Sequence, residues 1–171
     1  QIARKDRFAG CSVLVTGALG SVGRTAVHVA RKHGARVIAG VREREREEAA
    51  KLLVDSVIAI DNEKEIEKLF DLDAIADTVD GPTIHRLLRA IRSGGVVGSV
   101  LGAPEGAGSY PIRVEAMMAV PDASRLYQLA DDVARGELTL PIARQMKLSE
   151  IQEAHGLAEK GGSGGKIILT P

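Results

Sequence analysis

The stretch VLVTGALGSVGR, residues 13–24, constrains the fold of this chain more than any other segment. An apolar run that predicts a buried strand is followed at once by Gly17, Gly20 and Gly23, and then by a helical pattern. Glycines at this spacing let the chain turn sharply, let backbone approach a bound group closely and let a helix pack tightly on a strand. The stretch therefore predicts a strand, a tight turn and a helix that begins within the glycine run.

Short β-branched runs alternate with helical patterns along most of the chain. Such near-continuous apolar strands are typical of a parallel sheet that helices cover on both faces. The sequence therefore predicts an α/β fold, a Rossmann-type doubly wound parallel sheet of about six strands. Strands are expected at 12–16, 35–41, 56–60, 73–79, 94–101 and 112–118, and helices at 22–33, 43–53, 63–69 and 82–92.

At 171 residues the chain is long enough for one sizeable core. We expect the Rossmann domain to span 1–147, followed over 148–171 by a helix and a last strand. The glycine-rich KGGSGGK between that helix and strand is interpreted as a linker. Its spacing is one residue short of a phosphate-binding P-loop, and it follows a helix and precedes a strand, the reverse of the P-loop order.

Composition argues against several classes of partner. Lys plus Arg and Asp plus Glu both number 23, so no net charge favours nucleic acid or an anionic membrane. Aromatic residues make up 2% of the chain, too few for a base-stacking platform. One cysteine allows no internal disulfide, and no apolar run approaches the ~20 residues that cross a bilayer. We expect a soluble, cytoplasmic protein that binds neither nucleic acid nor membrane.

The glycine run predicts a dinucleotide site. Gly17, Gly20 and Gly23 leave a strand and open a helix, the context in which a pyrophosphate binds the amide groups of a helix N-terminus. Ala18 stands where the usual fingerprint has its first glycine, so a purely structural tight turn is the alternative.

The end of the second strand selects the form of the cofactor. An NAD-type site has an acidic residue there, whereas this chain has Arg42, a donor suited to a 2'-phosphate, with Arg44 or Arg46 in reserve. NADP(H) is therefore the expected cofactor. The alternative is a solvated helix in which Arg44 pairs with Glu48, and Glu47 with Lys51.

Two more strand ends are expected to border the cofactor, because ligands of open α/β sheets lie outside the carboxyl ends of the strands. Val79 follows the fourth strand, and Leu101 and Gly102 follow the fifth; ordinary strand termini are the alternative. Asp77 is open to two interpretations, as an acid or base or as a carboxylate bound by backbone amides.

Four segments carry a family resemblance: GCSVLVTGALGSVGRTAVHVARKHGARVIAG, ADTVDG, GGVVGSVLG and the ending LSEIQEAHGLAEKGGSGGKIILTP. In these segments the chain resembles the medium-chain dehydrogenase/reductases, in particular their zinc-independent quinone oxidoreductase-like branch. The resemblance covers nearly the whole chain. It implies an NADPH-binding Rossmann domain that supports hydride transfer to a quinone or an activated alkene. By the same resemblance the pyrophosphate turn matches Gly17, Gly20, Ser21, Val22 and Gly23, and the 2'-phosphate position matches Arg42.

The resemblance also implies a catalytic domain that precedes this stretch in the family, with substrate bound between the two domains. We expect that domain to be missing here, with 148–171 being the part that packs on it. The chain alone is then expected to be inactive or nearly so, and we assign it no catalytic or metal-binding residue.

Alternatives remain open. The TGxxGxxG form also occurs in short-chain dehydrogenases, but their Tyr-x-x-x-Lys pair is absent, since Val114 follows Tyr110 and Asp131 follows Tyr127 at that spacing. A non-catalytic nucleotide-binding or regulatory Rossmann module is the other alternative. The edge of the sixth strand, 112–118, is a candidate surface for a homodimer.

Overall fold

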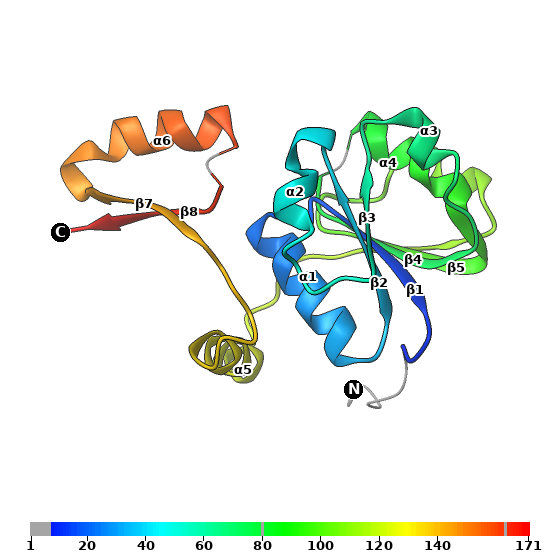
Figure 1. Ribbon diagram of the computed structural model, residues 1–171, viewed down its shortest axis with the longest axis horizontal. Helices are drawn as coiled ribbons and strands as arrows, with labels where there is room; N and C mark the ends of the chain where they lie inside the picture. The colour runs from blue at the N-terminus through cyan, green and yellow to red at the C-terminus, as the bar shows by residue number, and fades with distance from the viewer. Residues whose placement is uncertain (1–7, 80, 163) are drawn as a thin grey trace. The chain divides into compact units, whose positions relative to one another are not determined.

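Six parallel strands form the central sheet of the computed structural model, which describes residues 8–79, 81–162 and 164–171 (Figure 1). The strands lie in the order β3-β2-β1-β4-β5-β6, which confirms the expected doubly wound sheet. They are β1 (Ser12–Thr16), β2 (Arg36–Val41), β3 (Ser56–Ala59), β4 (Leu72–Asp77), β5 (Ile91–Ser99) and β6 (Arg113–Ala116). The connecting helices are α1 (Ser21–Lys32), η1 (Glu43–Glu45), α2 (Arg46–Ala49), α3 (Glu63–Ile66), α4 (Pro82–Leu87), η2 (Leu88–Ala90) and η3 (Ala107–Ser109).

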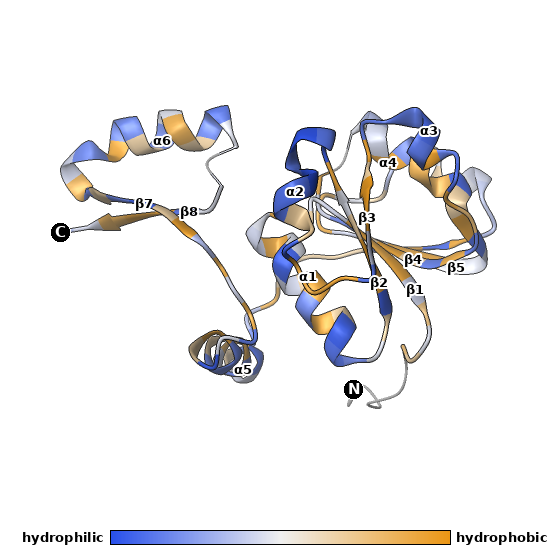
Figure 2. Ribbon diagram, in the orientation of Figure 1, coloured by the Kyte–Doolittle hydropathy of each residue, from blue (hydrophilic) through white to orange (hydrophobic). Residues whose placement is uncertain are grey.

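Alternate side chains of the strands enter separate hydrophobic clusters on the two faces of the sheet. Val13 and Val15 of β1 pack with α1 and α2, whereas Leu14 packs on the other face with α3 and α4. Figure 2 shows stretches in the hydrophobic colour along the strands of the sheet, and α2 mostly in the hydrophilic colour. The apolar runs in the sequence therefore mark strands that are covered on both sides.

The order of the strands reverses between β1 and β4. The chain runs from β1 outward through β2 to β3, and then returns to place β4 on the other side of β1. In open α/β sheets, ligands bind in the crevice outside the carboxyl ends of the strands, at the point where the strand order reverses. The turn after β1 and the turn after β4 therefore flank the place where a ligand is expected.

Several expected boundaries shift in the structure. The helix expected at 43–53 is a 3-10 turn, η1, followed by the four-residue α2, and the helix expected at 82–92 gives way to strand at Ile91. Ile91 pairs with Leu72 across the sheet, and the register then jumps to the Ala74–Val96 pair. Strand pairing across the sheet thus overrides the local helical pattern at Ile91.

The second compact unit, Ala123–Pro171, contains α5 (Ala123–Ala134), β7 (Ile142–Lys147), η4 (Leu148–Glu150), α6 (Ile151–Lys160) and β8 (Lys166–Thr170). The first unit ends at Asp122. Within the second unit, β7 pairs in parallel with β8 in a two-stranded sheet of their own. The expected linker includes Ser163, which lies outside the described residues.

Candidate functional site

The turn after β1 leaves no room for side chains at two of its glycines. Gly17 has a φ of +61°, and a Cβ on it would lie 2.6 Å from both Thr78 Oγ1 and Val79 Cγ1. A Cβ on Gly23 would lie 2.1 Å from the carbonyl oxygen of Gly17. Gly17 therefore provides the left-handed turn against the end of β4, and Gly23 lets α1 pack on that turn.

The N-terminus of α1 lies directly after this turn. Gly20 is its N-cap, the Arg24 amide donates to the Gly20 carbonyl at 2.8 Å, and no described side chain caps the helix. The first turn holds Ser21, Val22 and Gly23 and no acidic residue. Amide groups at such an end, together with the helix dipole, favour a bound anion.

Three neighbouring strands end in buried polar residues that bond to one another. The carboxylate of Asp77, the last residue of β4, accepts from Thr16 Oγ1 at the end of β1 (2.9 Å) and from Ser99 Oγ at the end of β5 (3.0 Å). All three residues are at most 1% exposed. One buried carboxylate thus ties β1, β4 and β5 together at the carboxyl edge.

The same group fixes the loops that follow these strands. The Val79 amide donates to Asp77 Oδ1 at 3.3 Å, and the Leu101 amide donates to Ser99 Oγ at 3.2 Å. Thr78 donates its amide to Thr16 Oγ1 (3.0 Å) and its hydroxyl to the Thr16 carbonyl (2.7 Å). Of the two interpretations of Asp77, binding by neighbouring donors describes it, although two of those donors are hydroxyl groups.

The expected site residues from β1, β4 and β5 therefore meet at one edge of the sheet. Val79 lies against the glycine turn, while Leu101 and Gly102, whose φ is +107°, follow β5. Three apolar side chains at this edge are partly exposed: Val22 by 53%, Val79 by 42% and Leu101 by 55%. Their exposure leaves apolar surface for a ligand that also contacts the α1 amides.

Arg42 follows β2, the strand beside β1. Its side chain is 58% exposed, and its Nη1 lies 3.9 Å from Glu45 Oε1. Its backbone amide donates to Glu45 Oε2 at 3.0 Å. The guanidinium is thus at the expected strand end, with a carboxylate beside it that the sequence analysis did not single out.

Arg46 is bound within the protein. Its Nε donates to Glu43 Oε1 (3.0 Å), its Nη1 to the Val57 carbonyl (3.3 Å) and its Nη2 to Glu65. The hydrogen bonds that Arg46 donates to Glu43 and Glu65 raise the pKa of Arg46, and the bond that it donates to Glu65 lowers the pKa of that carboxyl group. Arg46 links α2, β3 and α3, so a role in holding a 2'-phosphate requires it to leave these partners.

The ion pairs expected along the helix after β2 take a different form. Lys51 pairs with Glu48 at 2.6 Å, where a pair with Glu47 was expected. Glu48 also lies 3.8 Å from Arg24. The i,i+4 spacing does not apply to Lys51, because α2 ends at Ala49 and the chain turns there.

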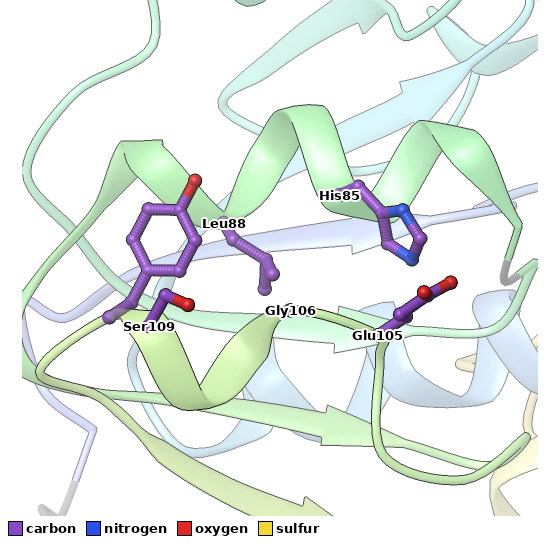
Figure 3. A pocket seen from close by; sticks show the side chains of 6 residues that line it. His85, Leu88, Glu105, Gly106 and Ser109 are labelled. Carbon is purple, nitrogen blue, oxygen red and sulfur yellow. The ribbon is translucent and has the colours of Figure 1, made fainter.

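A separate pocket lies between α4 and the loop after β5. It has a volume of about 610 Å³ and is lined by His85, Leu88, Glu105, Gly106, Ser109 and Tyr110. In Figure 3, His85 points from α4 toward Glu105. None of the expected cofactor residues lines this pocket, so it is distinct from the edge formed by the glycine turn.

Neither a cluster of metal ligands nor a membrane-spanning helix occurs among the described residues. No group of three or more His, Cys, Asp or Glu side chains within them is arranged to hold a metal ion. No helix among them is both long and apolar enough to cross a membrane.

Comparison with known proteins identifies relatives by sequence. Residues 52–169 match the family model described as zinc-binding dehydrogenase. An acryloyl-coenzyme A reductase of Metallosphaera sedula is 29% identical over 178 aligned positions, which cover 99% of this chain and 53% of that protein. The acryloyl-coenzyme A reductase of Sulfurisphaera tokodaii is also 29% identical, covering 93% of this chain and 50% of its own length. The chain thus spans about half the length of these relatives.

Solved structures share the fold. The quinone oxidoreductase of Coxiella burnetii superposes with a TM-score of 0.84 at 23% identity, over 96% of this chain and 54% of that one. CurA of Vibrio vulnificus, solved in complex with NADPH, gives a TM-score of 0.75 at 18% identity, over 95% of this chain and 57% of that one. The chain belongs to the zinc-binding dehydrogenase family, and its fold is that of the cofactor-binding domain of a medium-chain dehydrogenase/reductase.

Proposed function

We propose that this chain is the NADP(H)-binding part of a quinone or enone oxidoreductase, and that it supports hydride transfer from the nicotinamide. The observation that carries the proposal is the glycine turn packed against the end of β4, with an uncapped helix N-terminus beside it. The relatives named as reductases, and the NADPH bound by CurA, support it.

The expected residues other than Arg46 each have a physical task in this proposal. The amides of Ser21 and Val22 bind the pyrophosphate, and Gly17, Gly20 and Gly23 let it approach. Arg42 binds the 2'-phosphate, a task suited to the planar donors of a guanidinium. The loops that hold Val79, Leu101 and Gly102 border the rest of the cofactor. When bound, the nicotinamide supplies the hydride chemistry.

The proposal assigns no catalytic residue to this chain. Its described residues provide surfaces for the cofactor, and we propose that the groups enclosing a quinone or alkene substrate come from the rest of the enzyme. The chain alone is then inactive or nearly so. The second candidate, a nucleotide-binding module without catalysis, shares the same cofactor site and differs only in lacking that other half.

Calorimetric titration with NADPH and NADH tests the cofactor site. We expect the chain to bind NADPH more tightly, and Arg42→Ala to weaken NADPH binding by about 1.5 to 3 kcal/mol, the loss of a hydrogen bond to a charged group. NADH binding should change little, because NADH has no 2'-phosphate.

Arg36→Ala is the matched control, because Arg36 is exposed at the opposite end of the same strand. It should leave both affinities unchanged. Equal losses from the two substitutions would mean that Arg42 contributes only general charge. Absence of binding by either nucleotide would count against the cofactor site itself.

We also propose that two copies pair along β6. This strand is an edge of the six-stranded sheet, and Met117 and Met118 after it are 52% and 89% exposed. Unpaired edges are natural pairing surfaces. Sedimentation velocity should show a dimer that Met118→Lys weakens, and a monomer at high concentration would rule the pairing out.

A further inference from the structure

Acidic side chains accept hydrogen bonds from the backbone amides at the end of β2. The Arg42 amide donates to Glu45 Oε2 at 3.0 Å, and the next amide, that of Glu43, donates to Asp61 Oδ1 at 2.8 Å. Glu45 Oε1 also lies 3.9 Å from Arg42 Nη1. One carboxylate, that of Glu45, therefore contacts both the amide and the guanidinium of the same residue.

A phosphate that binds Arg42 must compete with this carboxylate. Both groups are anions that the same guanidinium attracts, and two anions close together repel each other. Arg46 offers little relief, because it is bound to Glu43 and Glu65. The Glu45 charge thus opposes a 2'-phosphate, whereas a neutral ribose hydroxyl does not meet this repulsion.

We propose that Glu45 is a specificity-determining residue that limits the preference for NADPH over NADH by neutralising Arg42. This inference rests on the proposed function, since it requires that a nicotinamide dinucleotide binds beside β2. Arg42 attracts the 2'-phosphate and Glu45 restrains that attraction. The selectivity for NADPH over NADH is then set by the difference between these two contributions to the binding free energy.

Glu45→Gln removes the negative charge but keeps the hydrogen bond, because the glutamine oxygen still accepts from the Arg42 amide. We expect NADPH to bind about fivefold more tightly to this variant, the upper range for one exposed charge pair, and NADH affinity to stay the same. The gain should shrink at high salt. In the Arg42→Ala background the same substitution should have a smaller effect, because the group that Glu45 neutralises is gone.

Glu47→Gln is the matched control, an equal change in charge at an exposed position two residues further along, in α2. Thermal unfolding of each variant verifies that the fold is intact. Weaker NADPH binding by Glu45→Gln would overturn the inference and show that the carboxylate positions Arg42. Equal effects of the two substitutions, or weaker binding of NADH alone, would also overturn it. Failure of the unsubstituted chain to bind NADPH refutes the proposed function itself.

Discussion

Substitution of Gly23 by alanine is expected to abolish NADPH binding and to lower the free energy of unfolding by about 2 to 3 kcal/mol, the upper range for overpacking. The added Cβ would lie 2.1 Å from the Gly17 carbonyl oxygen and 2.7 Å from its carbon. These are backbone atoms, so relief requires that α1 move away from the turn. Urea denaturation and calorimetric titration measure the two effects.

Gly156→Ala is a suitable control for this substitution. Gly156 lies in α6, and a Cβ there meets no atom within 4 Å. Alanine is favoured over glycine within helices, so this variant should gain about 0.5 to 1 kcal/mol and keep its affinity for NADPH. An unchanged NADPH affinity in Gly23→Ala would show that the turn does not require close packing of α1.

The glycine turn was predictable because its signal is local. Gly17, Gly20 and Gly23 follow one another within seven residues, and the strand and helix on either side have their own patterns. The structure begins α1 at Ser21 and ends β1 at Thr16, in line with expectation. The parallel sheet and the covering of both its faces also follow from local alternation of strands and helices.

The buried polar group was harder to predict, because its members are far apart in the chain. Thr16 and Asp77 are separated by 61 residues, and only the sheet brings them together with Ser99. A signal was present nonetheless, since each of these polar residues follows a short run of apolar residues or glycine at the end of its strand. Pairing of β1, β4 and β5 brings these three polar residues together at one edge of the sheet.

β7 was missed for a related reason. Its sequence IARQMK has little alternation, and of its six residues only Met146 is buried. The strand exists because it pairs with β8 after the chain has passed through α6. Such a strand is defined by its partner more than by its own residues.

Asp77→Ala is expected to cost about 3 kcal/mol or more of unfolding free energy, because buried donors lose their acceptor. Those donors are the hydroxyls of Thr16 and Ser99 and the Val79 amide. NADPH affinity should fall as well, since the loop against Gly17 is no longer fixed. Urea denaturation and titration under conditions where the variant is folded separate these effects.

Asp73 provides a comparison on the same strand. It lies near the start of β4, accepts from the Ser12 amide (2.8 Å) and from Arg92 Nε (2.7 Å), and these bonds lower its pKa. It therefore also links β4 to β1 and β5, but at the amino edge. Asp73→Ala should destabilise the protein by about 1 to 2 kcal/mol and leave the affinity of the folded chain for NADPH unchanged.

Comparison of the two aspartate substitutions therefore distinguishes a loss of stability from a loss of NADPH affinity. If both substitutions weaken NADPH binding in proportion to the stability lost, Asp77 acts only through the fold. If Asp77→Ala weakens binding and Asp73→Ala does not, the carboxyl edge itself depends on the buried carboxylate. We expect the second result, because Val79 and the glycine turn are bonded or packed to the Asp77 group and Asp73 is at the other end of the strand.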